Sequence, residues 1–509
     1  MSSLNKEFEI KLLFPSDKLK AIENFIISKG GVRRQHLQAY YIDTPDFLLA
    51  RERMALRIRK EGRQWVQTLK VSTSNPLDRI EHNVVLGVGG NDAPQWDINL
   101  HDSHEAGKYL NKTFTKQQLH TLEFCFKTDI WRRKCIVNNR IGTVEFALDI
   151  GTISARHGAE FMISNVQELE IELKDGDSVA VLNHAKAFIK RFKAFIDTQS
   201  KAARGFLLAR GLDFPPPTRA KPISLKSSVG SAEAKSQLLY SCLDQILSNQ
   251  SILNTSPADY SEYLHQLRVG LRRLKVLLKY FSKQGIALNE ESLNNFKIVF
   301  DALGQYRDSN YVSSVLNPIL RSLEGPEIKL SSIENLPNPS HISQAILFQL
   351  LLVDVMLLEF ASPDSQSVDI AGRIINQSSA PFKKLIFKLL GSTFHFLSSQ
   401  NSRFADLHDE DIHTLRKKMK FLRYSLEFFK DYCNKKHYRN FFKSISIALD
   451  HFGLFNDICV SIQRIEGLTQ ADPSLLFALG WLKAERERVK NLCKKSLAKV
   501  IQETPAWKS

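Results

Sequence analysis

Two periodicities of apolar and polar residues divide the chain near its middle. Up to about residue 212 the runs are short and alternate, as in Glu7-Phe8-Glu9-Ile10-Lys11. Alternation with period two places successive side chains on opposite faces of a β-strand. Beyond about residue 233 the apolar residues recur with the 3.6-residue period of amphipathic helices. The pattern predicts an α+β multidomain protein with an antiparallel β domain first and an all-α domain second.

Two segments of the first part, residues 17–29 and 178–195, have helical periodicity. We expect them to cover the outer sheet face that bears Phe8 and Ile10. The domain boundary lies at Asp213-Phe214-Pro215-Pro216-Pro217, because consecutive prolines cannot propagate a helix. The predicted domains are residues 1–212 and 233–509, joined by a Pro-, Ser- and Lys-rich linker over 213–232.

The segment Ala345–Leu358 is densely apolar, but Gln349 and Asp354 interrupt it and it is too short to cross a bilayer. It therefore predicts a buried helix, and no membrane partner is expected. Glu7 and Glu9 stand where a secretory signal would need an apolar core. A cytoplasmic location is expected.

The charged faces of the predicted strands are sorted by sign. Acidic residues alternate in the first strand and in Glu168-Leu169-Glu170-Ile171-Glu172, whereas Leu56-Arg57-Ile58-Arg59 and Thr68-Leu69-Lys70 between them are basic. A solvated surface would mix the two signs. Alternate residues of an antiparallel barrel point inward, so these faces predict a lumen that encloses a polyanion and its bridging cations.

Composition narrows the class of partner. Lys and Arg number 70 against 54 Asp and Glu, which leaves a net charge of +16. The expected partners are therefore anionic. The six cysteines have no C-x-x-C spacing, which indicates neither a zinc site nor a disulfide framework and fits a reducing cytosol. No RNA-binding signature of the RRM type is present, and no specific nucleic-acid partner is expected.

The helical half contains an internal repeat. The segment from His265 to Lys275 is matched by the segment from His413 to Arg423, with basic residues at three, seven and ten positions after each histidine. These offsets fall within about 80° of arc on a helix. Further along, Leu303-Gly304-Gln305-Tyr306-Arg307-Asp308 is matched by Phe452-Gly453-Leu454-Phe455-Asn456-Asp457. The repeat predicts two related helical bundles facing one another, each with a basic stripe headed by a histidine.

In chain order, the motifs of the first domain are E-x-E-x-K, Tyr41-Ile42-Asp43-Thr44, L-R-I-R, T-L-K, Arg79-Ile80-Glu81, E-L-E-I-E-L and Ser200-Lys201-x-x-Arg204-Gly205. This set resembles the CYTH domain of the triphosphate tunnel metalloenzyme family, and the whole chain resembles bacterial inorganic triphosphatases that carry a C-terminal CHAD domain. The resemblance implies a β-barrel tunnel that hydrolyses inorganic triphosphate to pyrophosphate and phosphate. It also implies two Mg²⁺ or Mn²⁺ ions, one binding the triphosphate and one orienting the attacking water.

Residue chemistry assigns candidate roles within this resemblance. Arg and Lys grip phosphate oxygens, and carboxylates are the hard ligands that Mg²⁺ and Mn²⁺ take. The predicted catalytic residues are Glu7, Glu9, Lys11, Arg57, Arg59 and Lys70. The predicted substrate-binding residues are Lys11, Arg57, Arg59, Lys70, Arg79, Arg132 and Lys201. The predicted metal ligands are Glu7, Glu9, Asp149, Glu170 and Glu172.

Several assignments have structural alternatives. Arg59, Arg79 and Glu81 also fit an ion-pair ladder across neighbouring strands. Asp149 stands shortly before Gly151 and also fits the cap of a turn. Periodicity does not decide which two of Glu168, Glu170 and Glu172 bind metal. A register shift would bring Arg133 or Lys134 into the place of Arg132.

The helical half resembles the CHAD domain, which is named for its histidines on an α-helical scaffold. This resemblance implies binding of inorganic polyphosphate in a basic groove between the bundles. The chain departs from the usual R-D-x-D pattern at Asn310 in the first copy and at Asn456 in the second. The predicted polyphosphate-binding residues are His265, Arg268, Arg272, Lys275, Arg307, His413, Arg416, Lys420 and Arg423. Their structural alternatives are locally bonded histidines and a solvated helix face.

Two other functions fit the same motifs. The tunnel superfamily includes enzymes acting on thiamine triphosphate and ATP, including adenylate cyclases, so an organic triphosphate is an alternative substrate. A non-catalytic polyphosphate-binding protein is the second alternative. The motifs decide neither the preferred metal nor the oligomeric state, and they do not say whether the two domains are functionally coupled.

Overall fold

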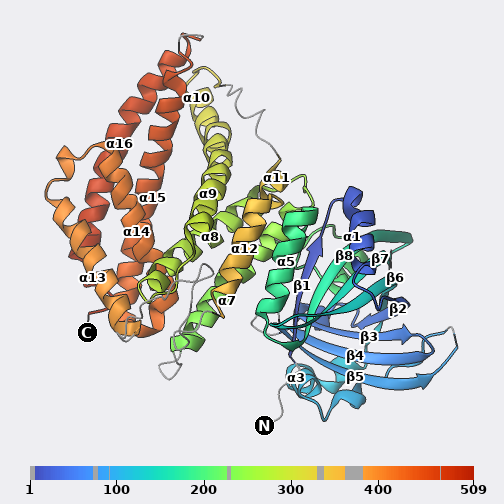
Figure 1. Cartoon of the computed structure of the whole chain (residues 1–509). Coiled ribbons are helices and arrows are strands. Elements are labelled where there is room, and N and C mark those ends of the chain that lie inside the picture. Colours follow the sequence, from blue (N-terminus) through green and yellow to red (C-terminus); the bar gives the residue numbers. More distant parts are fainter. Residues whose placement is uncertain are drawn as a thin grey trace. The chain divides into compact units, whose positions relative to one another are not determined.

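The structure, a computed structural model, describes residues 6–72, 78–90, 92–225, 231–328, 338–360, 382–469 and 472–508 (Figure 1). The chain divides into two compact units. The first contains residues 1–219, 243–267 and 339–360, and the second contains residues 220–242, 268–338 and 361–509. Two segments of the predicted helical domain therefore belong to the same unit as the predicted barrel.

A nine-stranded antiparallel sheet forms the centre of the first unit. Its order is β5-β4-β3-β2-β6-β7-β8-β1-β9, and a further pairing of β5 with β1 closes it into a barrel. The strands are β1 (Lys6–Leu13), β2 (Arg33–Asp43), β3 (Met54–Glu61), β4 (Gln64–Ser72), β5 (Asp78–Val88), β6 (Glu123–Asn138), β7 (Gly142–His157), β8 (Glu160–Gly176) and β9 (Phe195–Ile196). The predicted antiparallel barrel is confirmed.

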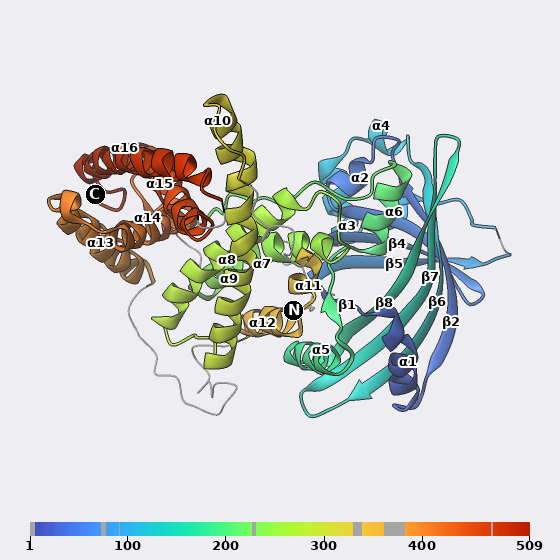
Figure 2. The same ribbon diagram turned by 90° about the horizontal axis from the view of Figure 1, so that it is seen from above.

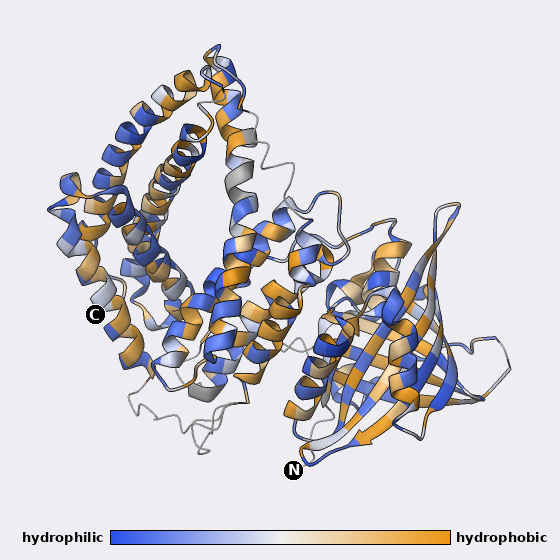
Figure 3. Ribbon diagram, turned by 45° about the horizontal axis from the view of Figure 1, so that its top comes forward, coloured by the Kyte–Doolittle hydropathy of each residue, from blue (hydrophilic) through white to orange (hydrophobic). Residues whose placement is uncertain are grey.

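Hydrophilic and hydrophobic residues alternate along the strands of the barrel, as the colours of Figure 3 show. In β3, Leu56 and Ile58 are fully buried, whereas Arg57 and Arg59 line the internal cavity. In β1, Phe8 packs against Phe360 with ring centroids 5.9 Å apart. The alternation of polar and apolar residues in the sequence therefore separates side chains that face the lumen from those that face the outside of the barrel.

Helices cover the outer face of the barrel. Phe25 of α1 (Leu19–Ile27) meets Phe188 of α5 (Val179–Phe192) edge to face at 5.2 Å, and Phe188 meets Phe146 of β7 at 5.2 Å. Each such aromatic pair contributes about 0.5–1.5 kcal/mol beyond its buried area. The helices predicted at 17–29 and 178–195 are confirmed. Further short elements are η1 (Ser16–Lys18), α2 (Leu48–Arg51), η2 (Ile98–His101), α3 (Glu105–Thr113) and α4 (Lys116–Leu119).

Three histidines meet beside β5. His101 is fully buried, and its Nδ1 lies 2.9 Å from Nδ1 of His82, whose ring stacks on His104 at 4.3 Å. Burial, together with the charges of His82 and His104, lowers the pKa of His101 from 6.5 to about 4. The folded protein therefore holds His101 neutral at pH values where the unfolded chain binds a proton.

We expect the first unit to lose stability as the pH falls from 6.5 toward 4. Because the folded pKa of His101 is depressed to about 4, the unfolded state binds more protons in this window. The full loss would be about 3 kcal/mol. Urea denaturation at several pH values should show a shallower pH slope for His101→Gln than for the unaltered protein. An identical slope in the two proteins would contradict this role of His101.

Helices complete the first unit: α6 (Lys201–Ala209), α11 (Pro339–Ser343), α12 (Ile346–Leu357) and parts of α7 (Ser231–Leu253) and α8 (Ser261–Ser282). Every residue of α12 from Phe348 to Met356 is buried, which confirms the predicted buried helix. Its two polar residues have partners in this unit, because Asp354 pairs with Lys186 of α5 and Gln349 accepts a hydrogen bond from Ile196.

The second unit is helical, in agreement with the predicted all-α domain (Figure 2). Besides parts of α7 and α8 it contains α9 (Glu290–Tyr311), η3 (Val312–Leu316), α10 (Asn317–Ser322), α13 (Phe382–Asn401), η4 (Phe404–Asp406), α14 (Asp409–Phe429), η5 (Lys430–Tyr432), α15 (Lys435–Glu466) and α16 (Leu475–Gln502). Tyr280 joins α8 to α14, because its hydroxyl lies 2.9 Å from Ser425 Oγ and its ring stacks on Phe421 at 5.6 Å. The two helices that carry the repeated stripe therefore pack together.

Within the described part of the chain, one helix of at least 18 residues, α15, is long and apolar enough to cross a bilayer. Core helices of soluble proteins pass the same test of length and composition. Of its apolar window, 39% is buried.

Candidate active site

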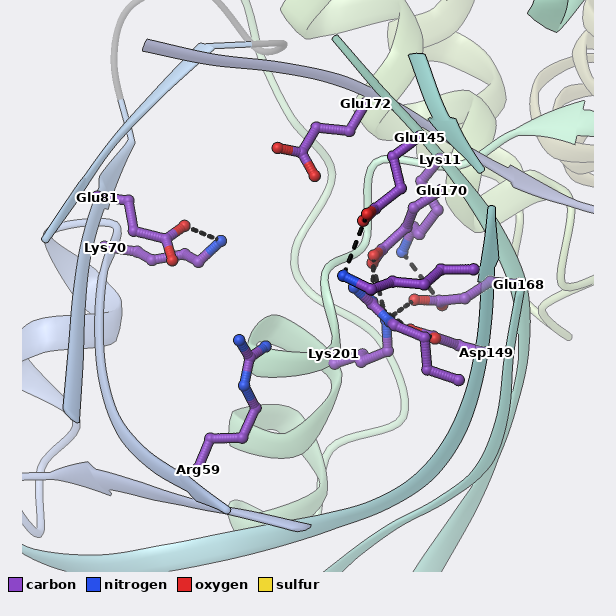
Figure 4. Close-up of polar contacts among 12 residues, drawn as sticks. Lys11, Arg59, Lys70, Glu81, Glu145, Asp149, Glu168, Glu170, Glu172 and Lys201 are labelled. Atoms are coloured by element: carbon purple, nitrogen blue, oxygen red, sulfur yellow. Dashed lines mark hydrogen bonds and ion pairs between the residues drawn. The ribbon is translucent and has the colours of Figure 1, made fainter. Parts of the chain in front are cut away.

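The barrel encloses a cavity of about 950 Å³ whose walls carry both signs of charge. Carboxylates of β1, β7 and β8 line one side, and cations of β3 and β4 line another. Figure 4 shows Lys70 and Glu81 on one side of the lumen and a group of carboxylates on the other, namely Glu145, Asp149, Glu168, Glu170 and Glu172. Arg59 reaches into the space between the two sides. The predicted sorting of charge around a lumen is present in the structure.

Three carboxylates, Glu9, Glu145 and Glu172, form an acidic row across neighbouring strands. Glu172 of β8 lies opposite Glu9 of β1 on one side and Glu145 of β7 on the other. Burial raises the pKa of Glu172, the charges of Glu145 and Glu9 add to the rise, and Lys174 opposes it. Lys174 Nζ lies 2.6 Å from Glu172, and Lys134 Nζ lies 3.1 Å from Glu145. Like charges at such positions repel, so a further cation would stabilise the row.

A second group of carboxylates, Asp149, Glu168 and Glu170, surrounds Lys201. Their oxygens lie within 4.8 Å of one another. Lys201 Nζ lies 2.7 Å from Asp149 and 2.8 Å from Glu170, and it also contacts Glu168. Arg132 donates to both oxygens of Asp149 at 2.7 and 2.6 Å and also contacts Glu170. We call these five residues the ion cluster.

Opposite charges around Lys201 and Glu170 favour the ionised forms of these two groups. Burial alone would lower the pKa of Lys201, but Asp149, Glu168 and Glu170 outweigh it and hold that pKa well above its ordinary value. Burial would likewise raise the pKa of Glu170, but Lys201 and Arg132 hold it well below its ordinary value. The lysine of the S-K-x-x-R-G motif therefore stands among the carboxylates rather than apart from them.

Lys11, the lysine of the E-x-E-x-K motif, is held by the segment that follows β9. Its Nζ lies 2.9 Å from Asp197 Oδ2 and also contacts the carbonyl oxygen of Gln199. Glu168 lies 3.6 Å from the same ammonium group. The side chain of Lys11 is 9% exposed, so these partners fix its position in the wall of the cavity.

On the cationic side, the basic residues are paired with local carboxylates. Lys70 contacts Glu81, which lies 3.9 Å from Arg57, and Arg59 contacts Glu61. Burial and the charge of Arg57 lower the pKa of Arg59. A strongly anionic ligand would relieve this crowding of positive charge.

Helix α6 lies against the inner face of the barrel and places Lys201 at its first turn. Phe206 meets Phe126 edge to face at 4.9 Å, and Phe126 stacks on Tyr41 at 4.4 Å. A Cβ atom on Gly205 would lie 2.1 Å from the Phe126 ring, so this close approach requires glycine. Ser200 caps the helix by accepting a hydrogen bond from the amide of Ala203 at 3.1 Å. The S-K-x-x-R-G motif thus has a structural basis.

The Y-I-D-T motif is explained by the loop after β2. Asp43 is fully buried and accepts hydrogen bonds from the amides of Thr44, Leu49 and Ala50 at 2.7, 2.8 and 2.9 Å. Burial nevertheless raises the pKa of Asp43. This residue shapes the turn that leads into β3 and its arginines.

The structure places most of the predicted site residues in the cavity wall. Cavity-lining members of the predicted sets are Glu9, Lys11, Arg57, Arg59, Lys70, Arg132, Asp149, Glu170, Glu172 and Lys201. The side chains of Glu7 and Arg79 lie outside the described residues. Asp149 stands within β7 and binds Arg132, so the alternative of a turn cap is wrong.

Some alternatives are settled by register. Arg132 and Lys134 line the cavity, whereas Arg133 lies 2.8 Å from Glu23 of α1. Glu81 pairs with Lys70 and Arg57, and Arg59 contacts Glu61. The place of Arg79 in the alternative ion-pair ladder lies outside the described residues.

The predicted site residues omit several charged residues of the cavity wall, among them Glu145, Lys134 and Asp197. Glu145 shares a face of β7 with Asp149, four positions later, and this alternation was a usable signal. Lys134 likewise shares a face of β6 with Arg132, which stands two positions earlier. Asp197 follows a two-residue strand and has no periodic signal.

The acidic row fits a divalent metal ion. Its carboxylate oxygens are the hard donors that Mg²⁺ and Mn²⁺ take, and Lys174 and Lys134 pair with two of its three members. Burial, with a smaller contribution from the charges of Glu145 and Glu9, raises the pKa of Glu172. The ion cluster has the ligand geometry for a metal as well, but Lys201 and Arg132 already neutralise it.

In the second unit, the stripe residues differ in exposure. Arg268 and Arg416, which are equivalent in the repeat, are each 7% exposed. Arg268 donates to the carbonyl groups of Leu303 and Gly304 at 2.5 and 3.1 Å, which joins the stripe of the first copy to its second motif. His413 Nδ1 lies 2.7 Å from Asn456 Oδ1, which does the same in the second copy.

Other members of the predicted polyphosphate set lie nearer the surface. His265 and Lys275 are exposed, and Arg272 and Lys420 are half-buried. Arg423 lies 3.8 Å from Glu427, and the side chain of Arg307 lies outside the described residues. Lys279, which the predicted set omits, has its pKa lowered by burial and by the charges of Lys418 and Lys283. Cations of α8 and α14 are therefore close enough to repel each other.

Comparisons with known proteins agree with this architecture. Residues 5–206 match the CYTH domain model, and residues 237–466 match the CHAD domain model. An inorganic triphosphatase of Haemophilus influenzae is 29% identical over 171 residues, which are 33% of this chain and 44% of that protein. The match thus spans less than half the length of this curated relative.

Two solved structures are also similar. The CHAD domain of the plant Ricinus communis has 21% identity and a TM-score of 0.44, covering 55% of this chain and 96% of that one. A putative adenylyl cyclase from Hippeastrum, described as having a dominant triphosphatase activity, has 15% identity and a TM-score of 0.28, covering 41% and 98%. From the two domain matches, the chain carries a CYTH domain followed by a CHAD domain.

Proposed function

We propose that the chain is a metal-dependent triphosphatase that hydrolyses inorganic triphosphate to pyrophosphate and phosphate inside the barrel. The observation that carries the proposal is the acidic row facing the cations of β3 and β4 across one closed lumen. The Haemophilus relative, an inorganic triphosphatase, supports the choice of substrate.

The cationic side chains of the lumen would bind the phosphate oxygens of the substrate. A tripolyphosphate carries about four negative charges near neutral pH, so its hydrolysis depends on positioning and charge neutralisation. Arg57, Arg59 and Arg132 can each offer bidentate contacts, while Lys11 and Lys70 act as point charges. Binding of the anion would draw Arg57 and Lys70 away from Glu81.

The acidic row would hold the divalent cation. Glu7, which belongs to β1 like Glu9, is a further candidate metal ligand. A bound Mg²⁺ or Mn²⁺ would neutralise phosphate charge and lower the pKa of water. Burial within the barrel limits access of bulk water to these groups and strengthens their electrostatic effect.

A phosphate-release screen tests this function. The purified protein would be incubated with triphosphate, ATP, thiamine triphosphate or long-chain polyphosphate, each with Mg²⁺, Mn²⁺ or EDTA. We expect metal-dependent release that is fastest from triphosphate. Faster release from an organic triphosphate would favour the alternative substrate class, and no release from any of them would favour a binding protein.

We further propose that the helical domain binds inorganic polyphosphate through cations of α8 and α14. Lys279 lies 4.2 Å from the centre of the Phe421 ring, and burial together with the charges of Lys418 and Lys283 lowers its pKa. Bound polyanions release counterions, so affinity should fall steeply as salt rises.

Reversal of three charges tests the polyphosphate site. We expect Lys275→Glu, Lys279→Glu and Lys418→Glu together to weaken binding of long-chain polyphosphate at least about 10-fold and to reduce its salt dependence. A matched triple change at Lys435, Lys436 and Lys443 of α15 alters the net charge equally and should have a smaller effect. Calorimetry would compare polyphosphate with single-stranded RNA of equal length, and equal affinity for both would leave only non-specific electrostatics.

A further inference from the structure

We infer that four buried polar side chains of the helical segments position the two lysines of the tunnel. These residues, Gln250, Ser251, Asn254 and Gln349, are called the polar clamp. They lie in α7, just after α7, and in α12, within the same compact unit as the barrel. The inference rests on the proposed function, because it assigns the clamp to the same lumen.

The clamp saturates the backbone of Ile196 in the two-residue strand β9. Gln349 Oε1 accepts a hydrogen bond from the amide of Ile196 at 2.8 Å. The carbonyl oxygen of Ile196 accepts from Gln250 Nε2 at 3.1 Å and from Asn254 Nδ2 at 3.2 Å. Gln250 and Gln349 are fully buried, so these bonds do not compete with water.

A further clamp contact lies two residues along the chain. Ser251 Oγ accepts a hydrogen bond from the amide of Thr198 at 2.9 Å and lies 3.1 Å from the Thr198 hydroxyl. The residue between these two anchored positions is Asp197. The clamp therefore holds the backbone on both sides of Asp197.

The anchored segment in turn holds both lysines. Asp197 Oδ2 lies 2.9 Å from Lys11 Nζ, and the carbonyl oxygen of Gln199 also contacts that ammonium group. The amide of Asp197 donates to the carbonyl oxygen of Lys11 at 3.0 Å. Ser200 then caps α6, whose first residue is Lys201. Displacement of residues 196–200 would move both cations relative to the carboxylates of the lumen.

Strand pairing alone gives this segment little support. β9 pairs with β1 over Leu12 and Leu13 only. The clamp supplies hydrogen bonds that the short ladder cannot, and all four of its members are at most 6% exposed. Because the clamp residues contact no cavity cation themselves in any described hydrogen bond, they act as positioning residues.

The test compares clamp variants with a matched control in the full-length protein. Gln250→Met and Gln349→Met remove hydrogen bonds to Ile196, and Ser251→Ala removes the bond to Thr198 with little change in volume. Gln245→Met is the control, because Gln245 is equally buried on α7 but donates to Gln266 at 3.0 Å instead of to β9. Ser251→Thr keeps the hydroxyl and should restore the activity that Ser251→Ala loses.

For the clamp variants we expect kcat/KM for triphosphate to fall about 10- to 100-fold, because misplacement of about 1 Å can have that effect. The fall should lie mainly in kcat if the lysines stabilise the transition state. Amide hydrogen exchange should become faster at Ile196 and Thr198. The control should lose comparable thermal stability while keeping its kcat within about twofold.

Equal losses of activity in Gln250→Met and Gln245→Met at equal loss of stability would overturn the inference. So would unchanged kinetics in a clamp variant whose amide exchange had increased. Absence of phosphate release from the unaltered protein would contradict the proposed function instead. In that case, calorimetric measurement of tripolyphosphate affinity would test the role of the clamp. The clamp variants should bind tripolyphosphate more weakly than the unaltered protein, and the control should bind it equally well.

Discussion

Replacing Lys201 with methionine is expected to destabilise the first unit by about 3–5 kcal/mol at neutral pH and to abolish hydrolysis of triphosphate. The change removes the cation that contacts Asp149, Glu168 and Glu170, and it leaves buried carboxylates with incomplete compensation. Breaking a buried ion pair from one side has an effect of this size, because the remaining charge cannot return to water. Urea denaturation measures the loss.

The pH dependence identifies the cause of that loss. The folded pKa of Glu170 is held well below 4.5, so the stabilisation by Lys201 is present above pH 4.5 and is lost as the pH falls through the folded pKa. The difference between the variant and the unaltered protein should therefore shrink in acid. Lys174→Met is the control, since Lys174 pairs with Glu172 but its side chain is 36% exposed, and its loss should change stability by less than about 1 kcal/mol. A difference that stayed constant as the pH fell from 7.5 to well below 4.5 would point to lost packing instead of lost charge.

Replacing Glu172 with glutamine is expected to have the largest effect on activity alone. If the acidic row holds the metal, turnover should fall at least about 100-fold, because even groups that only orient metal ligands contribute 10- to 100-fold. The metal-free protein should at the same time unfold at a slightly higher temperature. The raised pKa of Glu172 means that the fold disfavours its charge, and glutamine removes that charge.

The opposite directions of these two effects distinguish a metal ligand from a structural residue. Glu145→Gln and Glu9→Gln test the rest of the row, and Glu160→Gln on the exposed end of β8 is the control. The measurements are phosphate release at several Mn²⁺ and Mg²⁺ concentrations and thermal unfolding in EDTA. Full metal-dependent turnover in Glu172→Gln would remove this residue from the site.

The contents of the lumen could be predicted because β-strands have a local period of two. Lys11, Arg57, Arg59 and Lys70 were assigned to the interior from alternation alone, and all four line the cavity. Glu145 was accessible to the same argument through its spacing from Asp149 in β7. Side-chain direction within one strand depends only on neighbours in the chain.

Pairing between strands could not be predicted in the same way. The row of Glu9, Glu172 and Glu145 depends on the register of β1 and β7 against β8, which joins residues far apart in sequence. Lys201 was expected to contact phosphate, yet in the structure it neutralises Asp149, Glu168 and Glu170. A one-residue change of register would have produced different partners from the same periodic pattern.

By itself, the sequence determined the strand and helix character of the two halves, the sign of charge on each strand and the repeated basic stripe. These features follow from the spacing of residues within single helices and strands, so they can be predicted without knowledge of the fold. Only the tertiary structure divided the carboxylates into an acidic row and an ion cluster. It also placed Gln250 and Gln349 against Ile196, contacts between residues that lie 54 and 153 positions apart. Such contacts leave no periodic trace in the chain, because burial of a polar side chain is decided by the elements that close around it.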